Sequence, residues 1–312
     1  MYKFSLGNFI SESNQLLENV EIAYHIFGEL APEKKVIWVC HALTANSDAQ
    51  DWWPNFIGEN LTLDTEKYTI VCANILGSCY GTSFQKQEKL PLITIRDMVK
   101  LHQELAKFLQ ISEIELLLGG SLGGMQCLEW AIAEPDFIKK LFVIATNAKH
   151  SAWGIAFNEA QRMALELGEN GIDAARAIAM LSYRNYATFE ATQTDEEEKL
   201  EQYRAASYQR YQGEKLRKRF SKESYFMLSK AMDSHHLGRG RNSVENALNQ
   251  ITAETLVIGI DSDILFPVSE QKFIAEHIKN AKLEVISSLY GHDGFLIETE
   301  KISTLLKKHF NL

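Results

Sequence analysis

The segment Gly119-Gly-Ser-Leu-Gly123 constrains the fold of this chain more than any other sequence feature. It follows an apolar run at 114–118 and precedes a helical pattern at 122–133, so the sequence predicts a strand, a tight turn and a helix. A serine at such a turn is held clear of the sheet, where its hydroxyl becomes a nucleophile once a base accepts its proton. The alternative is a serine that only caps the helix. The spacing and its context together favour Ser121 as a nucleophile.

Short apolar runs alternate with amphipathic stretches along much of the chain, which predicts an α/β fold with a mostly parallel sheet covered by helices. The stretch at 148–243 differs, because it contains no convincing β run and is rich in alanine and long charged side chains. We interpret its charge runs as solvated helix faces. We therefore expect a discontinuous core formed by 1–147 and 244–312, with 148–243 inserted as a helical lid. The expected strands are 36–40, 68–73, 114–118, 140–145, 255–260 and 283–286, and the expected core helices are 94–109 and 122–133.

A serine turn of this type predicts its partners in the chain order serine, acid, histidine. His292 stands in a glycine-flanked loop after the last predicted strand, and Asp263 follows the strand at 255–260. Both positions are carboxyl ends of strands, where open α/β sheets keep their active crevice. Asp261 competes for the acid role. We favour Asp263 because its spacing from Pro267 resembles the acid loop of α/β-hydrolase folds.

Two backbone amides are candidates for stabilising the oxyanion that forms when a serine attacks a carbonyl carbon. Leu122, the residue after the nucleophile, supplies one amide. The loop at 41–44, which follows the strand at 36–40, supplies the other through Leu43. Cys127 is the rival nucleophile, but it falls inside the predicted helix and is better interpreted as a small buried hydrophobic residue.

Charge and cysteine content exclude several classes of function. The chain has 32 Lys and Arg against 41 Asp and Glu, a formal net charge of −9, which disfavours binding along nucleic-acid phosphates. No run approaches the roughly 18 apolar residues that cross a bilayer, so we expect no membrane segment. The four cysteines form no C-x-x-C pair, and the adjacent His235 and His236 have no companion ligands. We therefore expect free thiols, a cytoplasmic protein and no metal site.

Beyond the serine motif, the chain resembles the homoserine O-acyltransferases, a family of the α/β-hydrolase superfamily. Several of the matching segments are specific to this family rather than to the fold, and they occur in family order over nearly the whole chain. They are 41–44 (HALT), 51–53 (DWW), 74–82 (NILGSCYGT), 94–98 (TIRDM), 119–126 (GGSLGGMQ), 156–159 (AFNE), 211–215 (YQGEK), 238–241 (GRGR), 258–263 (IGIDSD), 265–267 (LFP) and 290–293 (YGHD). The resemblance implies an α/β-hydrolase fold with an inserted helical lid.

The same resemblance implies a two-step transfer of an acetyl group from acetyl-CoA to the hydroxyl of L-homoserine, in methionine biosynthesis. Ser121 then forms the acyl-enzyme, His292 is the general base and Asp263 orients the imidazole. Arg184 matches the family arginine that holds the carboxylate of the amino acid, and Asp293 matches the residue that holds its ammonium group. The family further implies a homodimer that pairs through the lid, small-molecule substrates and no permanently bound cofactor.

Other functions stay open at the level of sequence. Within transferases, the donor could be succinyl-CoA and the acceptor serine, since one methylene in the acceptor is worth only about 1–3 kcal/mol. A plain esterase uses the same triad, with water reaching the acyl-enzyme. A non-catalytic binding protein on the same fold is a third class, whose hallmark is a broken triad. The intact triad, the long lid and the pair Arg184 and Asp293 favour acyl transfer.

Overall fold

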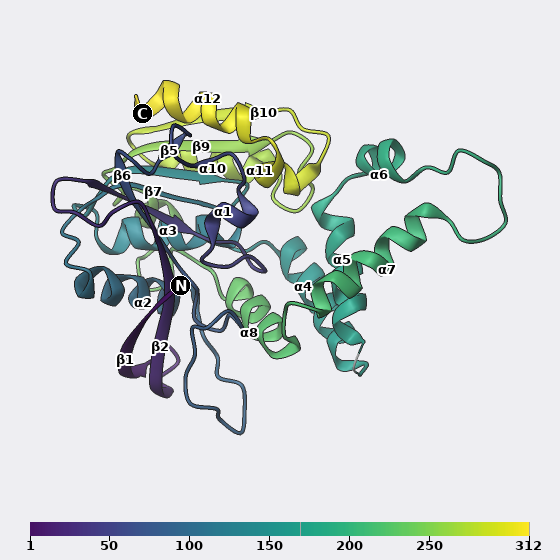
Figure 1. Cartoon of the computed structure of the whole chain (residues 1–312), viewed down its shortest axis with the longest axis horizontal. Coiled ribbons are helices and arrows are strands. Elements are labelled where there is room, and N and C mark those ends of the chain that lie inside the picture. Colours follow the sequence, from purple (N-terminus) through teal and green to yellow (C-terminus); the bar gives the residue numbers. More distant parts are fainter. Residues whose placement is uncertain (169, 312) are drawn as a thin grey trace.

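The computed structural model describes residues 1–168 and 170–311. In this part of the chain, eight strands form one sheet in the order β1-β2-β6-β3-β7-β8-β9-β10, and helices cover both of its faces (Figure 1). Six neighbouring strands, β6, β3, β7, β8, β9 and β10, are parallel to one another. The other two, β1 and β2, form an antiparallel hairpin at one edge. The strands of the sheet are β1 (Tyr2–Ile10), β2 (Leu16–Phe27), β3 (Lys35–Cys40), β6 (Tyr68–Ala73), β7 (Ile114–Gly120), β8 (Ile138–Ile144), β9 (Glu254–Ile260) and β10 (Ala281–Ile286), and a separate pair is β4 (Ile57–Gly58) with β5 (Leu63–Asp64).

The central strands are buried on both faces, and their side chains alternate between two hydrophobic cores. Within β3, Trp38 contributes to one core and Ile37 and Val39 to the other. Successive side chains of a strand point to opposite faces, so a continuous apolar run serves both layers. The first core is closed by α2 (Ile95–Phe108), α3 (Leu122–Ala133) and α10 (Val268–His277), and the second by α1 (Ala49–Trp52), α11 (Gly294–Ile297) and α12 (Thr299–Phe310).

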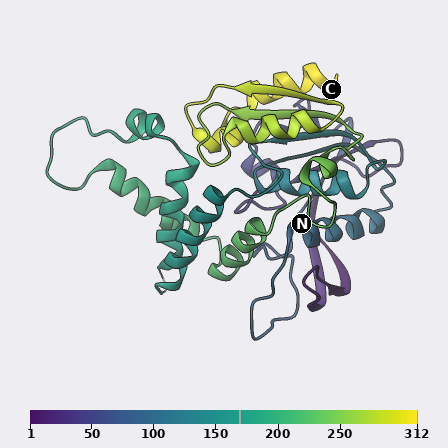
Figure 2. The same ribbon diagram turned by 180° about the vertical axis from the view of Figure 1, so that it is seen from behind.

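Between β8 and β9 the chain leaves the sheet and forms a helical layer, which we call the lid (Figures 1 and 2). Its helix α5 packs against α4 and α7 and also against η1, the short turn at Gly291–Asp293 in the core. The lid therefore lies over the carboxyl ends of the central strands. Its helices are α4 (Ala152–Glu166), α5 (Gly171–Tyr183), α6 (Tyr186–Gln193), α7 (Arg204–Arg217) and α8 (Lys222–Asp233), after which α9 (Val244–Leu248) leads back to β9.

The predicted α/β architecture, a mostly parallel sheet flanked by helices, is confirmed. The N-terminal hairpin of β1 and β2 was not predicted from the sequence. Within the described residues, no helix combines the length and apolarity needed to cross a membrane.

Candidate active site

Ser121 stands at a sharp turn between β7 and α3. Its backbone has φ +56° and ψ −126°, a conformation rare for residues other than glycine and typical of strained functional turns. The turn requires glycine at its second flank, because a Cβ atom on Gly123 would lie 2.1 Å from the carbonyl oxygen of Cys40. The Ser121 amide donates to the carbonyl of Ile144 on the neighbouring strand at 3.0 Å, which ties the turn to the sheet. The local sequence thus holds the hydroxyl at the carboxyl edge of the sheet.

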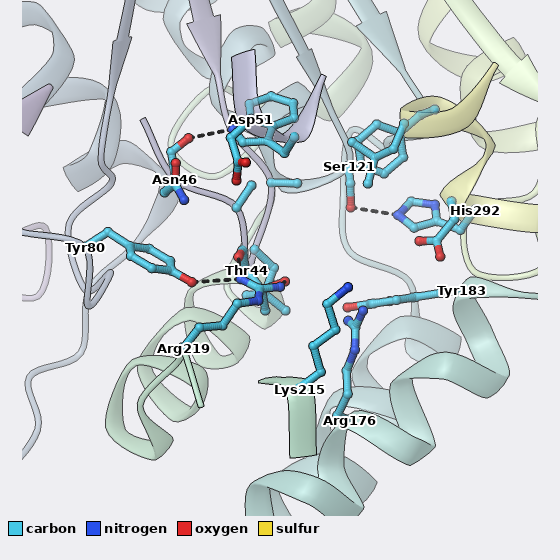
Figure 3. Close-up of a pocket in the computed structure, with 17 residues that line it drawn as sticks. Thr44, Asn46, Asp51, Tyr80, Ser121, Arg176, Tyr183, Lys215, Arg219 and His292 are labelled. Atoms are coloured by element: carbon cyan, nitrogen blue, oxygen red, sulfur yellow. Dashed lines mark hydrogen bonds between the residues drawn. The ribbon is translucent and has the colours of Figure 1, made fainter. Parts of the chain in front are cut away.

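The side chains of Ser121, His292 and Asp263 form a hydrogen-bonded chain. His292 Nε2 lies 2.9 Å from Ser121 Oγ (Figure 3), and His292 Nδ1 lies 2.7 Å from Asp263 Oδ2. The other oxygen of Asp263 accepts from the amides of Leu265 at 2.8 Å and Phe266 at 2.9 Å, so the carboxylate is fixed in place. The Asp263 side chain is 0% exposed and that of His292 is 3% exposed. This arrangement can generate a serine nucleophile without solvent in the proton path.

The competing acid, Asp261, faces away from the imidazole. Its Oδ1 accepts from the amide of Ser288 at 3.2 Å, and its own amide donates to Ile286 at 3.1 Å. Asp261 is exposed and joins the ends of β9 and β10. The structure therefore brings Asp263, rather than Asp261, to His292.

His292 is enclosed by aromatic rings from the core and from the lid. The rings of Phe266 and Phe295 lie 5.1 and 5.3 Å from the imidazole, and Tyr183 at the end of α5 lies 5.6 Å from it. Burial raises the pKa of the Tyr183 phenol above its usual value. These rings limit the access of water to the imidazole, so that it exchanges protons mainly with groups inside the site.

The two amides expected to bind an oxyanion, those of Leu43 and Leu122, are both free of protein partners: in the described part of the chain, neither donates a hydrogen bond. Leu43 lies in a turn in which the amide of Ala45 donates to the carbonyl of Ala42 at 3.1 Å. His41 supports this turn from the core. Its Nε2 accepts from the Ile75 amide at 3.1 Å, so the proton lies on Nδ1, which donates to the Ala42 carbonyl at 2.9 Å.

Burial determines the protonation state of His41. Its side chain is completely enclosed, and this lowers its pKa from 6.5 to about 4. The imidazole is therefore neutral near pH 7, as the acceptor role of Nε2 requires.

A cavity of about 640 Å3 opens next to Ser121 and His292, between the core and the lid (Figure 3). Its walls carry three cationic side chains from the lid segment, Arg176, Lys215 and Arg219. None of the three forms an ion pair with a carboxylate among the described residues. The same walls carry the carboxylates of Asp51 and Asp293, so the cationic groups exceed the anionic ones by one in a protein whose net charge is −9, and this excess suits an anionic substrate.

The two residues expected to bind the amino-acid substrate occupy different places. Asp293 lines the cavity, but Arg184 is not among the described residues that do so. Arg184 approaches Asp293 from the other side, with its Nε 3.0 Å from Asp293 Oδ2, and its guanidinium stacks 5.3 Å from the ring of Tyr290. The Nε–H is not aligned for a hydrogen bond, so the contact is an ion pair. Arg184 thus contacts a substrate-facing carboxylate without facing the cavity itself.

Arg176 is the cation that sequence reasoning missed. It lies on the face of α5 that meets the cavity, with its guanidinium 5.2 Å from the ring of Tyr183. The two residues are seven apart, which places them on one helix face. This spacing could have identified Arg176 from the sequence, because it places Arg176 on the same helix face as Tyr183. Arg184 directly follows Tyr183 but lies just beyond the last helical residue, in extended backbone.

The rival nucleophile, Cys127, is fully buried in α3 and belongs to the first hydrophobic core. All four cysteines are free thiols. In the described part of the chain, no group of three or more histidine, cysteine and acidic side chains is arranged to hold a metal ion.

Comparisons with known proteins confirm the predicted α/β-hydrolase fold. A family model described as the alpha/beta hydrolase fold matches residues 35–299. A homoserine O-acetyltransferase of Cyclobacterium marinum is 42% identical over an alignment that covers 96% of this chain and 92% of that protein. The solved structure of a homoserine O-acetyltransferase from Staphylococcus aureus is similar with a TM-score of 0.88 and 29% identity, over 100% of this chain and 95% of that one. An acetylester hydrolase from Corynebacterium glutamicum has a TM-score of 0.87 at 20% identity, over 100% and 96% of the two chains, so it shares the fold.

Proposed function

Because this chain belongs to the homoserine O-acetyltransferase family, it is an acyltransferase, and we propose that it works through an acyl-enzyme on Ser121. Its reaction is the transfer of an acetyl group to homoserine, the step that the family contributes to methionine biosynthesis. The observation that carries the proposal is the hydrogen-bonded chain Ser121–His292–Asp263, with separations of 2.9 and 2.7 Å, beside a cationic cavity.

In the first half-reaction, Ser121 Oγ attacks the thioester carbonyl of acetyl-CoA while His292 Nε2 takes the hydroxyl proton. The buried carboxylate of Asp263 accepts from Nδ1–H and stabilises the imidazolium. The C–S bond then breaks, and His292 gives its proton to the departing thiolate. The products are the acetyl ester of Ser121 and free coenzyme A.

In the second half-reaction, His292 removes the proton from the homoserine hydroxyl, which attacks the ester carbonyl of the acyl-enzyme. The bond to Ser121 Oγ breaks, and the proton returns to that oxygen. In both half-reactions the carbonyl oxygen becomes negative, and we assign its stabilisation to the free amides of Leu43 and Leu122. A single donor of this kind is worth about 10²- to 10³-fold in rate.

The acceptor is a zwitterion, and the cavity offers a partner for each of its charges. Asp293 lies beside His292 and suits the ammonium group. For the carboxylate we replace Arg184, the residue favoured from the sequence, by Arg176, because Arg176 lines the cavity. The planar guanidinium of Arg176 can donate two parallel N–H bonds to a carboxylate. Arg184 then serves as the ionic partner that orients Asp293 from behind.

The donor is a small molecule, and we propose acetyl-CoA, used as a substrate, with no permanently bound cofactor. The positive charge of Lys215 at the cavity wall supports an anionic donor. The family name specifies acetyl rather than succinyl transfer. We place the reaction in the cytoplasm, which agrees with the four free thiols.

The lid has a second proposed role, in dimerisation. Large apolar side chains are exposed on its helices and on the segments between them, and such side chains can pack against a partner. We propose that 148–243 is the lid, that 1–147 and 244–312 are the core, and that lids of two copies pair about a two-fold axis. The exposed side chains are Trp153, Ile155, Met163, Leu167, Leu181, Tyr186, Leu200, Tyr203 and Tyr211.

The proposal is tested by trapping the acyl-enzyme. Mass spectrometry of the protein mixed with acetyl-CoA alone is expected to find an acetyl group on the peptide that contains Ser121. Ser121→Ala is expected to release no coenzyme A, with or without homoserine. An acetyl group on Cys127 instead, or release of coenzyme A by the Ser121→Ala variant, would show that the nucleophile is wrong.

A further inference from the structure

Arg219 reaches from the lid to the loop that carries one of the proposed oxyanion donors. It lies between α7 and α8, and its Nη1 donates to the carbonyl of Thr44 at 2.5 Å and to the hydroxyl of Tyr80 at 2.8 Å (Figure 3). Its Nη2 lies 3.5 Å from Thr44 Oγ1. Arg219 is exposed and forms no ion pair with a described carboxylate, so these contacts to the core are its principal interactions.

Two peptide units connect Arg219 to the Leu43 amide. The Thr44 carbonyl, which accepts from Arg219, belongs to the same planar unit as the Ala45 N–H. That N–H donates to the Ala42 carbonyl at 3.1 Å. The Ala42 carbonyl in turn shares a planar unit with the Leu43 N–H and points the opposite way. Rotation of the first unit therefore weakens the bond that fixes the second, and with it the direction of the Leu43 N–H.

The two sides of this loop are supported differently. On the core side, His41 is buried and its Nδ1 donates to the Ala42 carbonyl at 2.9 Å, a contact that does not depend on the lid. On the lid side, support comes through Arg219 and its neighbour Phe220, which is buried with its ring 5.8 Å from that of Tyr80. The loop consequently has one fixed support and one that is present only when this part of the lid is docked.

We propose that Arg219 is a positioning residue that couples the docked lid to the oxyanion site by fixing the Thr44–Ala45 peptide and, through it, the Leu43 amide. The inference rests on the proposed acyl-enzyme mechanism, because it assigns Leu43 a role in stabilising the oxyanion. It adds that the lid affects catalysis as well as enclosing substrates. Formation of the acyl-enzyme is then expected to slow when this contact is removed, whichever leaving group the acetyl donor carries.

The test compares two acetyl donors that share only the acyl group. Acetyl-CoA carries phosphates, whereas p-nitrophenyl acetate carries none, and both acylate Ser121 through the same oxyanion. Arg219→Ala is expected to lower the pre-steady-state acylation rate constant about 10- to 100-fold with both donors, somewhat less than the loss of a whole oxyanion donor. The KM for homoserine is expected to stay within about twofold, because the acceptor partners are untouched. Arg219→Lys is expected to recover part of the rate, since an ammonium group can still reach the Thr44 carbonyl.

Arg217→Ala is the matched control. Arg217 lies at the end of α7, pairs with Asp173 at 2.9 Å and does not touch the core loop, so its loss is expected to leave both acylation rates unchanged. Melting temperatures and circular dichroism are measured for every variant, and rates are compared well below the lowest transition. If Arg219→Ala does not fold, the same two-donor comparison is made with Arg219→Lys, which is then expected to show the smaller but equal decrease.

Two results overturn the inference. A decrease confined to acetyl-CoA means that Arg219 binds the phosphates of the donor. Unchanged acylation with both donors, in variants that are folded, means that Arg219 only attaches the lid. Failure of the proposed function looks different, because the wild type itself then shows no burst of p-nitrophenol or coenzyme A that depends on Ser121.

Discussion

Removal of the Arg176 guanidinium is expected to slow the second half-reaction and leave the first unchanged. The carboxylate of homoserine exchanges its hydration for Arg176 when it enters the cavity, and without that partner it is left unpaired. A buried, unpaired charge costs about 2–5 kcal/mol, or roughly 30- to 5,000-fold in kcat/KM at 1.36 kcal/mol per factor of ten. Arg176 is only half-buried, which reduces the penalty. We therefore expect Arg176→Ala to lower kcat/KM for homoserine by roughly 30- to 300-fold.

The assay separates the two half-reactions and varies the acceptor. Rapid mixing with acetyl-CoA gives the rate of coenzyme A release, and mixing the isolated acyl-enzyme with homoserine gives the rate of transfer. A second acceptor, 3-amino-1-propanol, keeps the hydroxyl and the ammonium group of homoserine but lacks the carboxylate. If Arg176 binds the carboxylate, the wild type discriminates strongly between these acceptors and Arg176→Ala does not. Arg176→Lys is expected to restore part of the discrimination, because a point charge cannot form the paired hydrogen bonds.

Arg184→Ala is the informative comparison, since the sequence favoured that residue for the same role. Its loss removes the ionic partner of Asp293, so we expect a smaller decrease, about threefold to tenfold, that affects homoserine and 3-amino-1-propanol alike. The reasoning is refuted if Arg184→Ala abolishes the discrimination between acceptors while Arg176→Ala preserves it. Equal slowing of acylation and transfer by Arg176→Ala would also refute it, because acetyl-CoA does not use the carboxylate partner.

Three further predictions concern the triad, the stability and the assembly. Asp263→Asn is expected to lower turnover by about 10⁴-fold, the loss typical of a serine protease whose triad acid is replaced by asparagine. Asp261→Asn is expected to lower turnover less than about tenfold. Steady-state rates of the folded variants decide which aspartate is the triad acid. Burial lowers the pKa of His41 and His150 to about 4 and that of His235 to about 3. As the pH falls, these histidines take up protons in the unfolded protein before they do so in the folded protein. Their contribution to the unfolding free energy is therefore fully present above pH 6.5. It decreases on acidification toward pH 4, by about 1.4 kcal/mol per pH unit for each histidine. Urea titrations across this range are expected to show the fall, and a flat profile would contradict it. Light scattering is expected to give about twice the chain mass of 35.4 kDa, and a monomer at micromolar concentration would contradict the lid-paired dimer.

Most parallel strands could be predicted because they are buried on both faces and are therefore short continuous apolar runs, whereas β10 at the edge of the sheet is largely exposed or half-buried. The expected strand at 68–73 coincides with β6 (Tyr68–Ala73), and the helix expected at 122–133 coincides with α3. The hairpin of β1 and β2 had no such signal. Most of β1 is exposed or half-buried, and its pairing shifts register on both sides of Gly7, which has φ +86°. Irregular pairing of this kind interrupts the alternation by which a strand is recognised in a sequence.

Geometry at the edge of the sheet explains why the triad residues could be proposed from sequence. Ser121, Asp263 and His292 each follow a parallel strand, and the carboxyl ends of such strands meet at one edge. The direction of a lid side chain has no comparable rule. Arg176 lies within α5, and Arg184 directly follows its last residue. The packing of α5 against the core decides which of the two side chains faces the cavity. Sequence reasoning proposed Arg184 as the partner of the carboxylate, whereas the lining of the cavity leads us to propose Arg176, and the variants described above decide between them.

We infer that the choice between acyl transfer and hydrolysis depends on the groups that line the cavity rather than on the triad. An acetylester hydrolase shares this fold at a TM-score of 0.87, so neither the sheet nor the arrangement of strands distinguishes the two reactions. We attribute the preference of this chain for transfer to the way its acyl-enzyme meets the second substrate. In this chain, aromatic rings enclose His292, and the charges of Arg176 and Asp293 face the same cavity. A water molecule gains little from these charges, whereas a zwitterionic acceptor neutralises both and places its hydroxyl near the imidazole. Binding energy from the charged ends of homoserine is thus converted into orientation at the reacting oxygen, an advantage that water cannot share.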